Sequence, residues 1–370
     1  MKKILFFIPT LAHGGAEKVL VNLVNNLDNT KFNVTVQTLF DGGIQRQNLK
    51  HHIKTKSCMK KQFRGNSKVL QLLTPKQLYN RFIKEHYDII VSYLEGPTAR
   101  IVSGCTDKNT KLVCWIHVQQ ETLGIACASF RNYREAKNCY ERFDRIVCVS
   151  EYVKKNFIDN FNYKRKVDVL YNTNETDYII EQSNEIVDDY DFELNIPTLI
   201  GIGTLKKSKG FDKIIRIHSR LLNEGVQQRL IILGVGGEEK NLNELISTLG
   251  VSQTVTLLGY KTNPYKYISK SNMFVCASIA EGFSTAATEA LILGVPVVTV
   301  EVSGMKEMLG ENDEYGIVTE NNEDALYEGI KKMLTTPGTL EEYAAKALER
   351  GKYFSTEKTT KAVEDMLLNL

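Results

Sequence analysis

Two glutamates eight residues apart follow an apolar run in the second half of the chain. Glu281 ends a short loop after residues 273–276, and Glu289 lies about one turn inside the helix that the loop opens. Ser284 and Thr285 are good N-cap residues, so free backbone N–H groups and the helix dipole would form an anion site suited to a diphosphate. Carboxylates accept two hydrogen bonds at once from hydroxyl groups. An ordinary capped helix with two surface glutamates fits the spacing equally well.

A second candidate is the loop Gly203–Gly210, which follows another apolar run and contains Lys206, Lys207 and Lys209. Glycine lets the backbone approach a ligand closely, and lysine places positive charge beside a leaving diphosphate. The position after a strand favours this interpretation over a solvated lysine-rich loop.

Three weaker signals also follow apolar strands. His13–Glu17 contains Gly14 and Gly15 but is not Gly-x-Gly-x-x-Gly, so the dinucleotide fingerprint is absent. His117 stands where a catalytic or orienting side chain would be expected, although a lone histidine is more often structural. The loop that begins at Gly234 is explained equally well as a tight turn.

These turns need a scaffold of strands. Continuous apolar runs alternate with amphipathic segments such as 17–27 and 132–142, which indicates parallel sheets covered by helices on both faces. In the first half we expect strands at 4–8, 34–39, 89–92, 112–116, 146–149 and 167–170. In the second half we expect strands at 199–202, 230–233, 255–258, 273–276 and 295–300.

An acidic stretch at 176–195 interrupts this alternation, and 370 residues exceed what one core usually serves. We therefore predict an α/β protein with Rossmann-like domains at 1–180 and 190–352. The segment 353–370 is expected to return to the first domain as a helix. Asp189–Asp191 has the form Asp-x-Asp, but it lies in the acidic stretch and is interpreted as a solvated charge run. No zinc-type spacing of histidine and cysteine is present.

Composition limits the class of protein. Hydrophobic residues make up 42% and charged residues 25%, as in folded soluble proteins, and no run approaches the length of a membrane span. Seven scattered cysteines without a Cys-x-x-Cys pair indicate reduced thiols in the cytoplasm. Residues 1–175 hold 28 basic and 15 acidic side chains, so the first half is expected to meet an anionic partner.

Together these motifs resemble family 4 glycosyltransferases, a retaining group with the GT-B fold. The resemblance rests on the Gly-Gly-x-Glu turn Gly14–Glu17, on His117, on the loop that ends at Lys209–Gly210, and on the pair Glu281 and Glu289. It implies two Rossmann-like domains that face each other across a cleft. The first domain would bind the acceptor and the second the nucleotide-sugar donor.

The resemblance also implies roles for matching residues. His117 and Glu281 would be catalytic, since Glu281 would hold hydroxyls of the transferred sugar and His117 would contact the sugar or stabilise the transition state. Lys209 would neutralise the donor diphosphate, and Glu289 would bind the ribose. The predicted donor-binding set also comprises Gly14, Gly15, Gly203, Thr204, Gly234, Gly259, Tyr260, Gly282, Phe283, Ser284 and Thr285. Thr204 departs from the family, which usually has an arginine there that clamps phosphate.

The predicted function follows. The protein would move a hexose or N-acetylhexosamine from a nucleotide-sugar to a saccharide acceptor, with retention and with neither metal nor cofactor. The acceptor is expected to be lipid-linked, in surface polysaccharide synthesis. UDP is preferred to GDP, with Gly259 and Tyr260 contacting the base. Two alternatives stay open: a nucleotide-sugar epimerase of the same fold, and a non-catalytic nucleotide-sugar-binding partner of a transferase, which Thr204 favours.

Basic residues in the first half are interleaved with apolar ones, which suits an anionic membrane surface. We therefore expect a cytoplasmic protein attached peripherally to the inner face of the membrane, although two solvated faces fit equally. Nucleic acid is not expected as a partner because no recognised module appears. The first basic group is Lys54, Lys56, Lys60, Lys61, Arg64 and Lys68 with Met59 and Phe63. The second is Arg131, Arg134, Lys137, Arg142 and Arg145 with Phe130, Tyr133 and Tyr140.

Overall fold

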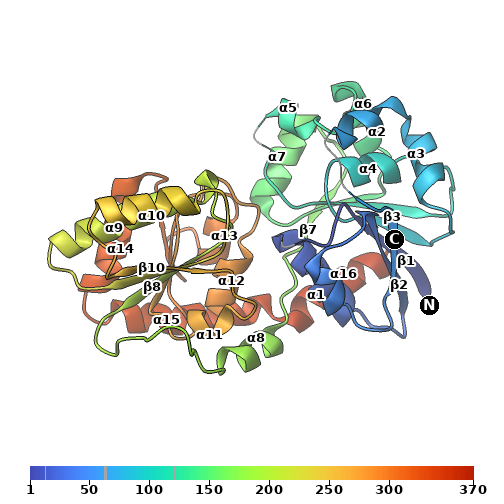
Figure 1. The fold of residues 1–370 in the computed structure, drawn as a ribbon. Helices are drawn as coiled ribbons and strands as arrows, with labels where there is room; N and C mark the ends of the chain where they lie inside the picture. The colour runs from blue at the N-terminus through green and yellow to red at the C-terminus, as the bar shows by residue number, and fades with distance from the viewer. Residues whose placement is uncertain (13, 62–64, 121) are drawn as a thin grey trace. The chain divides into compact units, whose positions relative to one another are not determined.

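The computed structural model describes residues 1–370 except 13, 62–64 and 121. The chain forms two compact α/β units (Figure 1). Unit 1 comprises Met1–Asn174 together with Thr356–Leu370, and unit 2 comprises Glu175–Ser355. The expected α/β class with parallel sheets is confirmed in both units.

The sheet of unit 1 is parallel and follows the order β3-β2-β1-β4-β5-β6-β7. Its central strands are continuous apolar runs that are buried on both faces, as a sheet covered by two layers of helices requires. In the register, Ile4 pairs with Val34 on one side and with Ile89 on the other. The strands are β1 (Lys2–Ile8), β2 (Phe32–Phe40), β3 (Lys54–Met59), β4 (Ile89–Ser92), β5 (Lys111–Ile116), β6 (Arg145–Cys148) and β7 (Val167–Val169).

Helices cover this sheet, and the last one comes from the end of the chain. The helices are α1 (Gly15–Asn26), α2 (Asn66–Leu72), α3 (Pro75–Phe82), α4 (Pro97–Val102), α5 (Leu123–Ala126), α6 (Tyr133–Tyr140), α7 (Glu151–Phe161) and α16 (Thr356–Leu368), with a 3₁₀ turn η1 (Ile44–Asn48). The Lys2 ammonium donates to the carbonyl oxygen of Leu367 at 3.0 Å, and the backbone N–H of Asp28 donates to Glu364 at 2.7 Å. The predicted return of the C-terminal helix to the first domain is therefore confirmed.

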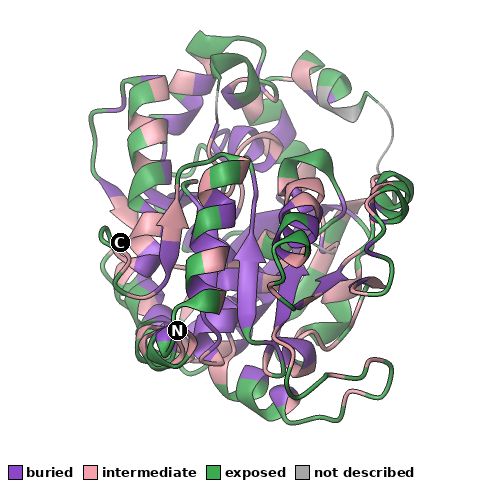
Figure 2. Cartoon of the chain, turned by 90° about the vertical axis from the view of Figure 1, so that its left-hand side faces the viewer, coloured by how far each residue is buried: buried purple, intermediate pink, exposed green. Residues whose placement is uncertain are grey.

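Unit 2 has a smaller parallel sheet in the order β10-β9-β8-β11-β12-β13. Its strands and the inward faces of its helices are buried (Figure 2), and the core is built from aliphatic side chains such as Ile214, Ile232 and Leu326. The strands are β8 (Thr198–Ile202), β9 (Arg229–Leu233), β10 (Val255–Gly259), β11 (Met273–Cys276), β12 (Val297–Val300) and β13 (Ile317–Thr319). The helices are α8 (Thr176–Ser183), α9 (Phe211–Asn223), α10 (Glu239–Thr248), α11 (Tyr265–Ile268), α12 (Thr285–Ile292), α13 (Met305–Leu309), α14 (Glu323–Thr335) and α15 (Thr339–Gly351), with 3₁₀ turns η2 (Lys207–Lys209) and η3 (Lys352–Phe354).

The acidic stretch belongs to unit 2 and is not a free linker. The Tyr267 hydroxyl donates to Asp189 at 2.5 Å, and the Lys261 ammonium also binds that carboxylate. The Lys266 ammonium donates to the carbonyl oxygen of Ile186 at 2.8 Å. The boundary at which the chain passes from unit 1 to unit 2 lies between Asn174 and Glu175, before the expected interval at 180–190. The acidic segment lies in unit 2 because positively charged side chains near α11 bind it.

Candidate active site

The carboxyl ends of parallel strands carry the ligand sites in sheets of this type, where the strand order reverses. In unit 2 the order reverses between β8 and β11. The loop after β8 and the loop after β11 therefore start at the same edge, and the backbone N–H of Ile279 donates to the carbonyl oxygen of Ser208 at 2.8 Å. The structure thus brings together the loop at 203–210 and the segment at 277–289, which lie far apart in the sequence.

Glycines allow this close approach of the loops. Gly210 has φ +65°, and a Cβ atom there would lie 2.2 Å from the carbonyl oxygen of Ala277. Gly234 has φ +144°, and a Cβ atom there would lie 1.9 Å from the carbonyl oxygen of Gly203. Backbone packing therefore accounts for Gly210 and Gly234 by itself, and a ligand-binding role for Gly234 stays a prediction.

Lys209 and Glu281 form an ion pair at this edge. The Lys209 ammonium donates to Oε1 of Glu281 at 2.5 Å, and the Ser278 hydroxyl donates to the same oxygen at 2.7 Å. Both side chains are partly accessible, with 28% of Lys209 and 14% of Glu281 exposed. A cation that can face a phosphate and a carboxylate that can accept hydrogen bonds from hydroxyls are thus held side by side. Ser278 was not predicted, because its contact with Glu281 becomes visible only once the loop is folded.

The helix α12 begins in this loop. Ser284 is the N-cap, and its hydroxyl accepts a hydrogen bond from the backbone N–H of Ala287 at 3.3 Å. Thr285 is the first residue of the helix, so its N–H belongs to the set that has no partner within the helix. The carbonyl oxygen of Gly282 accepts a bond from the Ser303 hydroxyl at 3.2 Å. This arrangement provides the helix N-terminus that an anion site needs.

The remaining predicted residues of unit 2 differ in exposure. The Phe283 ring is buried and packs edge-on against Phe354 with 5.6 Å between ring centroids, so only its backbone faces the loop. Glu289 is 3% exposed, which makes it a buried acid within α12. Tyr260 follows β10 and is 47% exposed, and Thr204 is exposed. The ring of Tyr260 is therefore accessible for stacking on a planar base.

In unit 1 the strand order reverses between β1 and β4. Gly14 caps α1 and Gly15 is its first residue, as the Gly-Gly turn predicted. A Cβ atom at Gly14 would lie 2.0 Å from the carboxylate of Glu17, which also accepts a bond from the Thr10 hydroxyl at 3.3 Å. An acidic side chain therefore already sits at this helix N-terminus, where negative charge is favoured. His13 lies outside the described residues.

His117 follows β5 and is 7% exposed. Its ring lies 4.7 Å from that of Tyr93 and is stacked against that of Trp115 at 6.3 Å, between centroids. Its Nε2 is buried with no hydrogen-bond partner among the described residues, which is unusual for a buried polar atom. Burial lowers the pKa of His117 to about 3, so the imidazole is neutral at physiological pH. A neutral ring with an unsatisfied nitrogen is suited to a hydrogen bond with a hydroxyl group.

Glu95 is a further candidate site residue that the sequence did not reveal. It follows β4, and its carboxylate accepts a hydrogen bond from the backbone N–H of His117 at 2.9 Å. Burial raises the pKa of Glu95 to about 7, although backbone hydrogen bonds oppose the shift. The available signal was an acid directly before Gly96 and Pro97 at the end of an apolar strand. Its proximity to His117 follows only from the pairing of β4 with β5.

Comparison with known proteins identifies the class. Residues 13–178 match the family model of Glycosyltransferase Family 4, and residues 182–350 match that of Glycosyl transferases group 1. The chain is a glycosyltransferase. It is 29% identical, over the full length of both proteins, to the N-acetylgalactosamine-N,N'-diacetylbacillosaminyl-diphospho-undecaprenol 4-alpha-N-acetylgalactosaminyltransferase of Campylobacter jejuni. It is 27% identical to the capsular polysaccharide biosynthesis glycosyltransferase CapM of Staphylococcus aureus, over 51% of this chain and 52% of the relative.

Solved structures support the fold of this glycosyltransferase. HepE of Anabaena in complex with UDP has a TM-score of 0.80 and 19% identity, and the match covers 100% of both chains. Sucrose-phosphate synthase of Thermosynechococcus elongatus has a TM-score of 0.78 and 16% identity, covering 100% of this chain and 99% of that one. At these identities the likeness concerns the fold, and the expected GT-B class is confirmed.

The two basic groups of the glycosyltransferase differ from the expected membrane faces. In the second group Phe130 and Tyr140 are buried, so they cannot enter a membrane. In the first group Lys54 and Lys56 belong to the edge strand β3, and Phe63 and Arg64 lie outside the described residues. Within the described part of the chain, no helix is both long and apolar enough to span a bilayer.

The described residues contain no group of three histidine, cysteine, aspartate or glutamate side chains arranged to hold a metal ion. Asp189 of the Asp-x-Asp sequence is instead bound by Lys261 and Tyr267. The stretch that was expected to be a solvated charge run is therefore partly bound, through Asp189, by a lysine and a tyrosine of the same unit.

Proposed function

We propose that this glycosyltransferase moves a hexose or N-acetylhexosamine from a UDP-sugar to a lipid-linked saccharide, with retention of configuration and without a metal ion. The observation that carries the proposal is the Lys209–Glu281 pair at the strand-order reversal of unit 2. It places a phosphate-binding charge and a hydroxyl-binding carboxylate next to a capped helix N-terminus.

Several features support a UDP-sugar as donor. Unit 2 presents a lysine, the N-terminus of α12 and the accessible ring of Tyr260 on loops that follow β8, β11 and β10. The lysine and the helix N-terminus suit a diphosphate, and the ring of Tyr260 suits a base. The relative HepE has been solved in complex with UDP and with UDP-glucose. The name of the Campylobacter relative describes transfer of N-acetylgalactosamine, so UDP-N-acetylhexosamines come first among the donors to test.

The acceptor is proposed on similar grounds. The Campylobacter relative is named for an acceptor that carries a diphospho-undecaprenol, and the CapM relative for capsular polysaccharide biosynthesis. With an acceptor of this kind, the enzyme would work at the cytoplasmic face of the membrane as a peripheral protein. Cosedimentation with vesicles that contain anionic lipid, at low and at high salt, tests this localisation, since an electrostatic attachment weakens as salt screens it.

The mechanism assigns separate tasks to the two units. Lys209 balances the charge that develops on the departing diphosphate, and Glu281 accepts hydrogen bonds from hydroxyls of the sugar. His117, as a neutral ring, binds a hydroxyl of the sugar through Nε2. The bond between the anomeric carbon and the UDP oxygen breaks while the acceptor oxygen attacks on the same face. The acceptor proton passes to a phosphate oxygen of UDP, so no carboxylate nucleophile is required.

Independence of metal is proposed because positive charge is already available at the phosphate position. The Lys209 ammonium and the free N–H groups at the start of α12 act where a divalent cation would otherwise neutralise the diphosphate. Activity that survives excess EDTA supports this part of the proposal. Activity that EDTA abolishes and Mg²⁺ or Mn²⁺ restores contradicts it.

One experiment tests the transferase function directly. The purified protein is incubated with UDP- and GDP-sugars in EDTA, and nucleotide release is measured with and without a lipid extract as acceptor. We expect acceptor-dependent release from one UDP-sugar, strongly reduced in Glu281→Gln and retained in the control Glu244→Gln, an exposed position on α10. NMR of the product then gives the anomeric configuration. Inversion contradicts the retaining mechanism.

A second candidate, a non-catalytic partner that binds nucleotide-sugar, is favoured by one observation. The phosphate loop presents Thr204, an exposed residue, where a guanidinium would clamp phosphate. Tight UDP binding by calorimetry without release from any donor supports this candidate. UDP-sugar interconversion without acceptor indicates the epimerase instead.

A further inference from the structure

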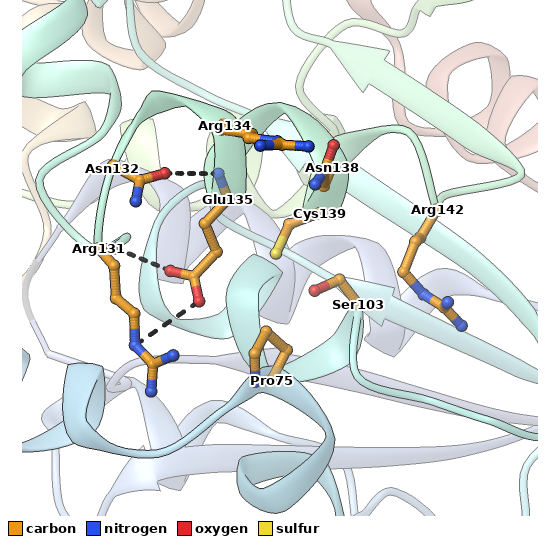
Figure 3. Close-up of a pocket in the computed structure, with 9 residues that line it drawn as sticks. All are labelled: Pro75, Ser103, Arg131, Asn132, Arg134, Glu135, Asn138, Cys139 and Arg142. Carbon is orange, nitrogen blue, oxygen red and sulfur yellow. Dashed lines mark hydrogen bonds and ion pairs between the residues drawn. The ribbon is translucent and has the colours of Figure 1, made fainter.

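A hollow on unit 1 is lined by residues that the transferase chemistry leaves unused (Figure 3). Its volume is about 370 Å³, and it lies between α6, the C-terminal end of α4 at Ser103 and the start of α3 at Pro75. Three arginines line it, Arg131, Arg134 and Arg142. The residues of the predicted site are absent from this lining, so the hollow is a separate feature of unit 1.

Helix geometry explains why the arginines converge. Arg134, Asn138 and Arg142 are spaced by four residues along α6 and the turn that continues it, so they share one face. Arg131 precedes the helix, one residue before the N-cap Asn132. In Figure 3, Arg131 and Arg142 stand on opposite sides of the hollow, with Ser103 and Pro75 between them.

The charges of the hollow do not cancel. Its one acidic lining residue, Glu135, accepts hydrogen bonds from Nε and Nη2 of the buried Arg100 at 3.0 and 2.9 Å. The guanidinium Nε of Arg131 lies farther from that carboxylate, at 3.9 Å, while the backbone N–H of Arg131 donates to it at 2.7 Å. Because Arg100 matches the charge of Glu135, the three lining arginines leave the hollow strongly positive.

Two of the arginines are held in place by neutral groups. Arg131 donates to the carbonyl oxygens of Gln71 and Leu72 at 2.6 and 2.8 Å, and Arg142 donates to that of Cys105 at 2.5 Å. These bonds orient the guanidinium groups without removing their charge. In the described part of the chain, the side chain of Arg134 has no hydrogen bond or ion pair. All of its donors are thus available to a ligand.

We propose that this hollow is a second anion site, which binds a phosphate or diphosphate group. Guanidinium groups bind phosphate through paired N–H donors, and several of them around one hollow match a group with several oxygens and more than one negative charge. The volume is within the range of small-ligand pockets, about 300–1,000 Å³. The phosphate can belong to a soluble molecule or to a lipid headgroup, and both present the same chemistry to the arginines.

The test measures binding and does not depend on sugar transfer. Calorimetry with inorganic diphosphate compares the full-length protein with the double variant Arg134→Gln/Arg142→Gln. A control, Lys108→Gln/Lys164→Gln, removes the same charge from two exposed positions of unit 1 outside the hollow. A fourth protein, Lys209→Gln, measures the contribution of the unit 2 loop. Circular dichroism confirms that each variant is folded.

We expect the double arginine variant to lose one of two binding events, or to bind about tenfold more weakly, since charge-assisted bonds are lost. The lysine control keeps both events. Vesicles of phosphatidylglycerol, compared with phosphatidylcholine, then identify the source. If a lipid headgroup fills the hollow, the arginine variant loses vesicle binding and soluble diphosphate competes with it. If a soluble phosphate fills it, diphosphate binding falls while vesicle binding is unchanged.

Three results overturn the proposal, and the first two concern the arginine variant and its control. One is equal binding of diphosphate and vesicles by the native protein and the arginine variant. The other is an equal loss in the lysine control, which would mean that net charge acts without a defined site. Loss of all diphosphate binding in Lys209→Gln alone would assign the binding to unit 2 and would also contradict a second site.

Discussion

The strand-order reversals of the two units carry different chemistry. In unit 2 a lysine and a glutamate meet at 2.5 Å while both remain partly accessible to solvent. In unit 1 the corresponding edge holds a histidine that is 7% exposed and a glutamate whose carboxylate binds the histidine backbone. The loops of unit 2 end in small residues, Gly210 and Ser284. In unit 1 the rings of Tyr93 and Trp115 pack against His117.

This difference has electrostatic consequences. Charged groups that stay near solvent keep their charge and can bind an ion such as a diphosphate. Buried groups are driven toward their neutral forms because burial removes water from the charged form, and for that reason the pKa of His117 falls and that of Glu95 rises. The same architecture therefore presents ionic binding in one unit and neutral hydrogen bonding in the other. The predictions that follow test this contrast.

The largest effect is expected in unit 2. Glu281→Gln keeps the side-chain size but removes the charge that accepts from Lys209 and Ser278. Loss of charged hydrogen bonds worth about 3 kcal/mol in the transition state lowers kcat/KM about 100-fold. Steady-state kinetics at saturating acceptor measure the loss, with Glu244→Gln as the matched control. An unchanged rate contradicts a role for this carboxylate.

A smaller loss is expected in unit 1. His117→Ala removes one hydrogen bond from a neutral ring, worth about 1.5 kcal/mol, so kcat/KM falls about tenfold. His52→Ala, an exposed position, is the control and leaves the rate unchanged. Because burial holds the pKa of His117 at about 3, protonation of this ring does not lower the rate between pH 5 and 8. A histidine-like pKa near 6.5 that vanishes in His117→Ala is incompatible with the neutral ring.

A positioning effect is expected from Ser278, which holds the Glu281 carboxylate. Ser278→Ala removes one hydrogen bond of about 1 kcal/mol, so the donor KM rises roughly fivefold while the fold is kept. Ser278→Thr keeps a hydroxyl and should recover much of the affinity. Equal KM values for Ser278→Ala and an exposed control, Ser252→Ala, show that Glu281 needs no such support.

The smallest expected effect is on stability. Glu95 has its pKa raised from 4.5 to about 7, so the folded protein keeps a proton that the unfolded chain releases. Stability is therefore lost as pH rises from 4.5 to 7. Glu95→Gln stays neutral at every pH. Above pH 7 its free energy of unfolding should exceed that of the native protein by about 1 kcal/mol, after allowance for the partial exposure of Glu95. Urea unfolding at pH 5 and 8 measures this, with Glu141→Gln as control. A native stability that rises over this range contradicts the shift.

Much of the fold could be predicted because buried parallel strands are continuous apolar runs. Residues 89–92 were predicted as a strand with the observed bounds. The missed strands, β3 and β13, lie at sheet edges, and β3 alternates lysine with small polar residues. A strand at the edge of a sheet does not need to be a continuous apolar run. Lysine in such a strand also discourages pairing with another chain. The sequence of β3 therefore resembles that of a basic loop.

The site was partly predictable for a related reason. Lys209, Glu281 and His117 stand next to apolar strands, so position along the chain was enough to select them. Glu95 and Ser278 act through contacts that depend on strand order and loop closure, which local sequence does not encode. Burial of Phe130 and Tyr140 likewise depends on packing against other elements, so the interleaved pattern alone suggested a surface.

The return of α16 makes unit 2 an insertion within unit 1. The Thr356 hydroxyl donates to the carbonyl oxygen of Asn174 at 2.6 Å, so the two points where the chain leaves and re-enters unit 1 are adjacent. During synthesis unit 2 emerges complete from the ribosome before unit 1 receives its last helix. Unit 1 is therefore completed after unit 2, and a direct splice of residue 174 to residue 356 would make unit 1 a continuous chain.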